Sequence, residues 1–126
     1  MSGCAKRVSI SPPVPQKGRS VETGVPGKGL EDLSPHAQAS LQLTEQGRSL
    51  LENGKANNAI RTFERAINLN STNGLNYYYL SEAWLFKGKF KQAEEFNSLA
   101  EIYLKASPEW ALRVRTQRGR IEELNK

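Results

Sequence analysis

The chain has 126 residues, of which 37% are hydrophobic and 25% charged, and its formal net charge is +5 at pH 7. Residues 1–33 carry five basic and three acidic residues, 34–106 carry eight and seven, and 107–126 carry five and three. This even spread excludes a basic block of the kind that marks a nucleic-acid or anionic-membrane surface. No apolar run approaches the roughly 18 residues needed to span a bilayer, and the single cysteine, Cys4, excludes an internal disulfide.

Residues 1–33 have the composition of a disordered Pro/Gly/Ser-rich tail or tether. Apolar residues are too few there to offset the entropy of ordering, and helix and strand periods are interrupted at Pro12, Pro13, Pro15, Gly18, Gly24, Pro26, Gly27 and Gly29. The run Pro12-Pro13-Val14-Pro15 also has the P-x-x-P form of a polyproline ligand. A spacer is the favoured interpretation of this run.

Five helices are predicted in the rest of the chain, over residues 35–53, 56–69, 75–87, 90–105 and 108–124. Ser34-Pro35 and Ser107-Pro108 are helix starts, with a hydroxyl N-cap and a proline at the first helical position. Asn53-Gly54 and Gly88 provide left-handed stops. Because no stretch alternates like a strand, we expect an all-α fold of antiparallel helix pairs joined by short turns.

A pattern of small residues recurs in register after 34 residues, which indicates stacked helical repeats. The first unit, about 40–73, contains Leu43, Gly47, Leu50, Gly54, Ala59, Phe63 and Ala66. The second, about 74–107, contains Tyr77, Leu80, Ser81, Trp84, Gly88, Ala93 and Ala100. The pattern resembles the tetratricopeptide repeat. The resemblance implies a helical domain over 34–126, a short α-solenoid of two repeats in which 108–126 form a capping helix.

Small residues at matching positions predict where the helices of each pair touch. Gly47 and Ser81 are expected to face Ala59 and Ala93, because only small side chains let two helices approach to about 8–10 Å. Asn97 departs from the pattern, since it stands where the first unit has Phe63. Phe96 is expected to turn inward in its place. On the last helix the predicted inward side consists of Trp110, Val114, Ile121 and Leu124.

The third predicted helix is unusually apolar, with five of the ten aromatic residues of the chain between positions 77 and 86. One of its stripes belongs to the repeat core. The resemblance places the other on the concave groove, where the first unit contributes Leu41, Thr44, Arg48, Leu51 and, at the matching end position, Glu52. The predicted partner-binding groove is therefore Leu41, Thr44, Arg48, Leu51, Leu75, Tyr78, Glu82, Leu85 and Phe86. The alternative is that neighbouring helices bury most of this stripe as core.

Other candidate sites are weaker. Arg113, Arg115, Arg118 and Arg120 are spread around the last helix by about 100° per residue, so a solvated capping face is favoured over a phosphate-binding strip. His36 is the only histidine, and no Cys, His or carboxylate cluster has metal-ligand spacing. No phosphate-binding glycine loop and no nucleophile with its base are present in the sequence. We expect no enzyme, no cofactor and no metal.

Ser2-Gly3-Cys4 resembles the lipidation site of a bacterial lipoprotein, in which small residues precede a lipid-bearing cysteine, here Cys4. The apolar signal segment that such a site requires does not precede it in this sequence. An ordinary thiol in the tail is the alternative. A lipidated Cys4 implies the periplasm with an outer-membrane anchor, whereas an unmodified thiol implies the cytoplasm.

These observations predict a protein–protein interaction module that holds a peptide or subunit in its groove. A tetratricopeptide lipoprotein of this kind would be an accessory of an envelope assembly or secretion apparatus, as the resemblance implies. The alternative from another class is nucleic-acid or anionic-surface binding through the arginine-rich last helix and the basic tail. Self-association is a third, purely structural, alternative.

Overall fold

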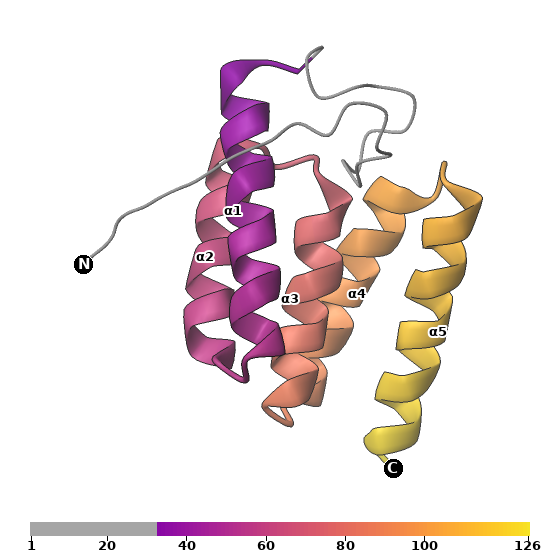
Figure 1. Cartoon of the computed structure of the whole chain (residues 1–126). Coiled ribbons are helices and arrows are strands. Elements are labelled where there is room, and N and C mark those ends of the chain that lie inside the picture. Colours follow the sequence, from indigo (N-terminus) through magenta and orange to yellow (C-terminus); the bar gives the residue numbers. More distant parts are fainter. Residues whose placement is uncertain (1–32) are drawn as a thin grey trace.

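The computed structural model describes residues 33–126, which fold into five α-helices without a strand (Figure 1). The helices are α1 (Pro35–Glu52), α2 (Ala56–Leu69), α3 (Gly74–Phe86), α4 (Phe90–Leu104) and α5 (Pro108–Leu124). The predicted all-α class is confirmed, and the predicted helix ends agree to within one residue. The expected tether and Cys4 lie outside the described residues.

Local chemistry explains how these helices begin. The Ser34 hydroxyl accepts a hydrogen bond from the Ala37 N–H at 3.1 Å, and Pro35 follows at the first helical position. The Asn73 side chain accepts from the Leu75 N–H at 3.1 Å and caps α3. Ser107 makes no such side-chain bond at the start of α5. Of the predicted helix start, only Pro108 contributes there, because its fixed φ suits the first turn of a helix.

The same helix stop occurs twice, 34 residues apart. At the end of α1 the Lys55 N–H donates to Leu50 O at 2.9 Å, around Gly54 at φ 77°. At the end of α3 the Lys89 N–H donates to Trp84 O at 2.9 Å, around Gly88 at φ 75°. Both turns are Schellman motifs, whose left-handed position favours glycine. The repeat in the sequence is therefore also a repeat in backbone geometry.

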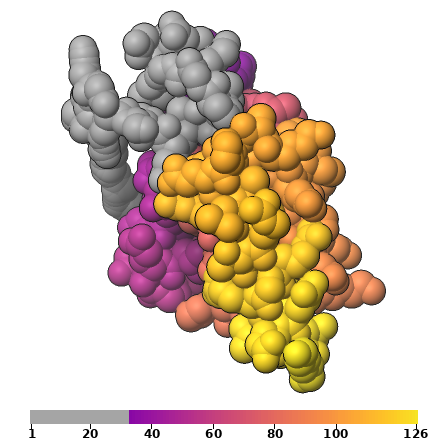
Figure 2. Space-filling model, turned by 90° about the vertical axis from the view of Figure 1, so that its right-hand side faces the viewer, coloured from indigo at the N-terminus to yellow at the C-terminus, as the bar shows by residue number. Residues whose placement is uncertain are grey.

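The helices are arranged as consecutive neighbours. α1 packs on α2 and α3 on α4, while α2 contacts α3 and α4 contacts α5. α1 and α5 lie at opposite ends of this row, with α3 between them (Figure 1). Figure 2 shows the side on which α5 and the end of α4 form the outer surface. The arrangement agrees with a short helical repeat and leaves α1, α3 and α5 to flank one face.

The core lies between the helix pairs, and its positions follow the repeat. Ala59 and Ala66 in α2 are fully buried, as are Ala93 and Ala100 in α4. The Ser81 hydroxyl donates to the Ala93 carbonyl at 2.6 Å, which confirms that these two residues face each other. Matching small residues thus mark the close helix contacts of both units.

Gly47 has a close neighbour on α2 that the repeat pattern did not assign to it. A Cβ built on Gly47 would lie 2.7 Å from Cδ1 and 2.8 Å from Cζ of Phe63, so the phenyl ring occupies the space that the glycine leaves open. Phe63 is one turn beyond Ala59 on α2 and is fully buried. The large ring reaches α1 only because its partner has no side chain.

Most of the predicted inward side of α5 is buried. Trp110 and Val114 join a core cluster with Leu75, and Ile121 packs with Leu85. Leu124 was expected to point inward but is 57% exposed. It is the last residue of α5 and lies beyond the cluster that Ile121 forms, so it has no neighbouring helix to cover it.

Candidate functional site

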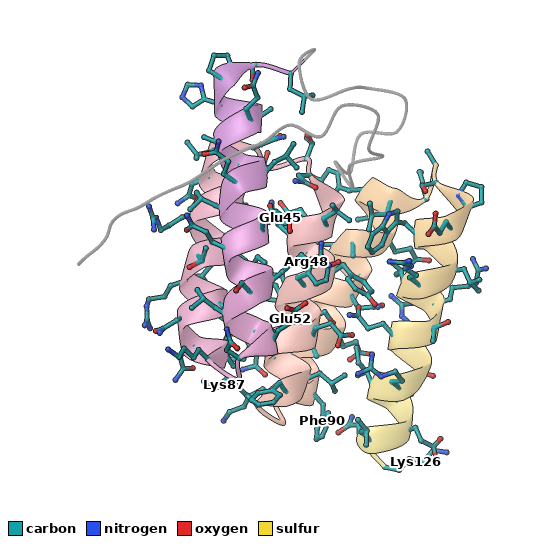
Figure 3. The ribbon with its side chains drawn as sticks, in the orientation of Figure 1. Glu45, Arg48, Glu52, Lys87, Phe90 and Lys126 are labelled. Carbon is teal, nitrogen blue, oxygen red and sulfur yellow. The ribbon has the colours of Figure 1, made fainter. Side chains whose placement is uncertain are left out.

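A shallow hollow of about 170 Å³ opens between α1 and α3. Its lining residues are Arg48, Leu51 and Glu52 from α1, and Tyr78, Tyr79 and Glu82 from α3. Arg48 precedes Leu51 and Glu52 by about one turn of α1, and Glu82 follows Tyr78 and Tyr79 by about one turn of α3. On each helix these residues therefore share a face. In Figure 3, Arg48 and Glu52 lie along the side of α1 that faces α3, and Glu45 continues the same side one turn earlier. We call this site the α1–α3 hollow.

Aromatic rings form the α3 wall of the hollow. The rings of Tyr78 and Tyr79 meet edge to face, with centroids 5.1 Å apart, and both pack edge-on against Trp110 of α5, at 5.3 and 6.3 Å. Tyr79 also stacks on Phe63 at 6.0 Å. Such ring pairs stabilise by about 0.5–1.5 kcal/mol beyond their area burial. The two tyrosines are therefore held rigidly while remaining partly exposed.

Arg48 supplies positive charge at the α1 edge of the hollow. Its guanidinium carbon lies 4.9 Å from the centroid of the Tyr79 ring, a cation–π distance. Its Nη1 also lies 3.3 Å from Glu45 Oε2. These contacts orient the guanidinium over an aromatic surface, so that a flat positive group and a ring are presented together.

Glu82 closes the hollow on the side of α5. Arg120 donates to Glu82 Oε2 at 2.7 Å, and Gln117 Nε2 donates to the same oxygen at 2.8 Å. The hydrogen bond to Glu82 raises the pKa of Arg120 above its ordinary value. Burial raises the pKa of Tyr78 above 10.0, and the Glu82 carboxylate raises it further. Near neutral pH the Arg120 guanidinium is thus protonated, and Tyr78 is a neutral phenol.

The predicted groove residues divide into three groups. Arg48, Leu51, Tyr78 and Glu82 line the α1–α3 hollow, and Glu52 joins them. Leu41, Thr44, Leu75 and Leu85 are buried, so they belong to the core and offer no surface to a partner. Phe86 is 63% exposed at the end of α3 and does not line the hollow. The core interpretation therefore holds for the four buried residues, and partner binding by the other five stays a prediction.

Thr44 illustrates why the groove prediction was too broad. The threonine hydroxyl donates to Asn76 Oδ1 at 2.7 Å, and both side chains are fully buried. Here α1 approaches α3 closely enough to exclude a ligand. The missed residue is Tyr79, which lies beside the predicted stripe. Its only signal in the sequence is the run of three tyrosines, which does not distinguish the exposed rings from Tyr77 in the core.

Three of the four arginines on α5 are engaged within the domain. Arg113 lies 3.2 Å from Glu109 and 4.5 Å from the Trp110 ring centroid, and Arg118 lies 3.2 Å from Glu101. Arg120 is paired with Glu82 as described. Their charges are therefore partly neutralised by acidic neighbours, and they do not converge on one anion-binding surface.

A buried polar network that the sequence did not predict joins α4 to α5. Asn97 Nδ2 donates to Val114 O at 2.9 Å and to Gln117 Oε1 at 2.8 Å. Arg118 Nε donates to Asn97 Oδ1 at 2.8 Å. Asn97 therefore replaces a core aromatic with a hydrogen-bonding centre, and Phe96 beside it is only partly buried. This network holds Gln117, and through it Glu82, in position at the hollow.

Within residues 33–126, no group of three or more His, Cys, Asp or Glu side chains is placed to hold a metal ion. None of the five described helices is both long enough and apolar enough to cross a membrane. Comparison of the chain with protein-family models, with curated proteins and with solved structures finds no significant match.

Proposed function

We propose that this protein is a protein–protein interaction module of the tetratricopeptide-repeat type, and that the α1–α3 hollow binds side chains of a partner peptide. The observation that carries the proposal is the composition of the hollow. Two immobilised tyrosine rings and Leu51 provide apolar contact, while Arg48, Glu52 and Glu82 surround them with fixed charge. Tyrosine and arginine are the residue types that dominate binding energy at protein interfaces.

The size of the hollow favours a peptide over a cofactor. Sites for small molecules have volumes of about 300–1,000 Å³, and the hollow has about 170 Å³ and is open to solvent. A hollow of this volume can hold a few side chains of a partner peptide, while the rest of the peptide lies along the surface of the protein. Recognition of a peptide along a helical groove works in this way, through spaced side-chain anchors.

Attachment to the bacterial envelope is a separate part of the proposal. It depends on Cys4 as a lipidation site, and its support is the Ser2-Gly3-Cys4 sequence followed by a Pro/Gly/Ser-rich stretch. In this role the domain would hold a subunit of an envelope assembly near the membrane. Mass spectrometry of the N-terminus of the protein from its native host tests the lipid directly.

Selection of peptides on the full chain tests the binding proposal. Random peptides displayed on phage are selected against the immobilised protein, and the affinities of those recovered are compared with two tyrosine variants. Tyr78→Ala removes one wall of the hollow and should weaken binding at least about 30-fold, the effect of a 2 kcal/mol anchor. Tyr103→Ala is the matched control, because Tyr103 is also a partly exposed stacked tyrosine but lies outside the hollow.

A charge variant separates loss of binding from loss of folding. Glu52 is exposed and makes no ion pair within residues 33–126, so Glu52→Lys should leave the thermal melt unchanged while altering the peptides that are selected. Equal weakening of peptide binding by Tyr78→Ala and Tyr103→Ala would contradict the proposal. So would a result in which none of the three variants, Glu52→Lys included, changes peptide binding.

A further inference from the structure

We propose that the turn between α3 and α4 binds an anionic membrane surface. Its sequence is Phe86-Lys87-Gly88-Lys89-Phe90-Lys91, in which three lysines and two phenylalanines surround one glycine. We call residues 86–91 the α3–α4 turn. None of them lines the α1–α3 hollow, so this second surface is independent of the proposed peptide site.

The corresponding turn of the first repeat shows that folding does not require these side chains. Residues 52–57 form the same Schellman turn around Gly54 that 86–91 form around Gly88. The first turn has no aromatic residue, and its one acidic and one basic residue cancel, whereas the α3–α4 turn carries a charge of +3. Because both turns have the same backbone, the two phenylalanines and the two additional lysines are not needed to form it.

The charges of the α3–α4 turn are open to solvent and are not neutralised by the rest of the described domain. Its three lysines are exposed, and none of them forms an ion pair within residues 33–126. Lys87 donates to the neutral amide of Asn57 and lies 5.3 Å from the centroid of the Trp84 ring, so its positive charge remains. In this respect the lysines differ from the three paired arginines of α5.

The charge totals of long segments conceal this cluster. Residues 34–106 carry eight basic and seven acidic residues, but three of the eight basic ones lie within 87–91. The ends of α1, α3 and α5 lie at one end of the row of helices (Figure 1). The other segments at this end, 52–57 and 120–126, each carry equal numbers of acidic and basic residues. The net positive charge of these three segments therefore comes from the α3–α4 turn.

Apolar side chains accompany the charges at the same end of the molecule. Phe86 is 63% exposed, and Leu124 at the end of α5 is also well exposed. Phe90 is half-buried, because it packs on the cluster that contains Ile121. Leu124 continues the face of Ile121 by about one turn of α5. This end of the domain thus presents exposed apolar groups next to unpaired ammonium groups.

An anionic membrane surface fits this combination better than an acidic peptide does. On a protruding turn, an exposed phenyl group can enter the membrane interface while the lysines keep their ammonium groups among the lipid head groups. Lysine is a mobile point charge and lacks the planar fork with which arginine recognises a single carboxylate. Three lysines therefore suit the diffuse negative charge of many head groups. The contact is weak and reversible, since each lysine strengthens binding about fivefold (about 1 kcal/mol).

Co-sedimentation of the full chain with vesicles tests the proposal. The vesicles contain phosphatidylcholine alone, or phosphatidylcholine and phosphatidylglycerol in equal amounts, and we expect binding to the anionic vesicles only. K89Q/K91Q removes two exposed, unpaired lysines and should weaken this binding about 25-fold. The matched control R65Q/K105Q removes two exposed charges further along α2 and beyond the end of α4. It should have little effect, because charges more than a Debye length of about 10 Å from the membrane are screened.

A second pair of variants tests the apolar part of the contact. Phe86→Ala should weaken binding to the anionic vesicles about tenfold, because the exposed part of the phenyl group no longer enters the interface. Leu112→Ala is the control, since Leu112 is a similarly exposed apolar residue near the start of α5. Its removal should leave vesicle binding unchanged. Thermal melts of both variants should match the parent, because both side chains lie on the surface.

The same measurements can overturn the proposal. It fails if the chain does not bind anionic vesicles, if the two charge variants weaken binding equally, or if Phe86→Ala binds as tightly as the parent. It also fails if polyglutamate shifts the amide signals of 86–91 and anionic vesicles do not, which would assign the turn to an acidic protein segment. None of these outcomes affects the α1–α3 hollow, whose peptide binding is measured separately.

Discussion

Asn97 of α4 donates a 2.8 Å hydrogen bond to Gln117 of α5, and both side chains are almost completely buried. The second repeat thus joins its neighbouring helix through paired amides at the position where the first repeat has Phe63. Gln117 in turn donates to the carbonyl of Tyr78 at 3.0 Å and to Glu82. The pair connects the helix junction to the α1–α3 hollow.

Removal of one member of this pair should be costly. Asn97→Ala leaves Gln117 Oε1 buried without its donor and removes the acceptor of Arg118 Nε, and an unsatisfied buried polar group costs about 1–3 kcal/mol. We expect the free energy of unfolding, measured in urea, to fall by that amount. Glu95→Ala on the exposed side of α4 should change it by less than about 0.5 kcal/mol. Equal effects of the two substitutions would show that the amide network contributes nothing.

Two glycines within helices should respond oppositely to alanine. Gly47→Ala places a methyl group against the buried Phe63 ring, and overpacking of this kind costs about 1–3 kcal/mol. Gly119 in α5 has no atom within 4 Å of its Cβ position, so Gly119→Ala should stabilise by about 0.5–1 kcal/mol through helix propensity. Thermal melts of both variants measure the difference. A Gly47→Ala protein as stable as the parent would refute the close contact.

The last helix should be required for a stable second repeat. Deletion of 108–126 removes Trp110 and Val114 from the cluster around Leu75, exposing apolar surface. We expect dye binding or aggregation of the truncated chain. Deletion of 122–126 alone removes only exposed residues and should have little effect. The capping role is contradicted if the longer deletion leaves a monomeric protein with a cooperative melt and no dye binding.

High pH should weaken the fold through two tyrosines. Burial raises the pKa of Tyr77 and of Tyr78 above 10.0, and the Tyr77 hydroxyl also donates to Ser71 O at 2.7 Å. Their protonated forms therefore stabilise the fold fully below about pH 10, and this contribution is lost as the pH rises through the raised folded-state pKa. Urea unfolding at successive pH values should show a smaller loss for Tyr78→Phe than for the parent. Identical curves would contradict this assignment.

The helices were predictable because their signals are local. The signals at Ser34-Pro35, Gly54 and Gly88 each act within one turn of the chain. The 34-residue recurrence indicated which helix faces carry small side chains. The identity of the neighbour was harder to predict. Gly47 contacts Phe63 because of how far a large ring reaches across the pair, and no pattern of small residues carries that information.

The candidate site was predictable only in outline. The aromatic surplus of α3 located the surface, and four of the nine predicted residues line the hollow. The burial of each side chain was not predictable. Thr44 is buried by the approach of α1 to α3, and Leu75 by the packing of α5. Asn97 was recognised as a departure from the repeat, but its role depends on Gln117, which is twenty residues away and belongs to a different helix.

Amide chemical-shift mapping tests the central claim most directly. The full-length ¹⁵N-labelled protein is titrated with a peptide that was selected on it. We expect the largest shifts at Arg48, Leu51, Glu52, Tyr78, Tyr79 and Glu82, which line the hollow. The account is contradicted if the shifts instead cluster on the exposed apolar residues of α4, Leu99, Ile102 and Tyr103.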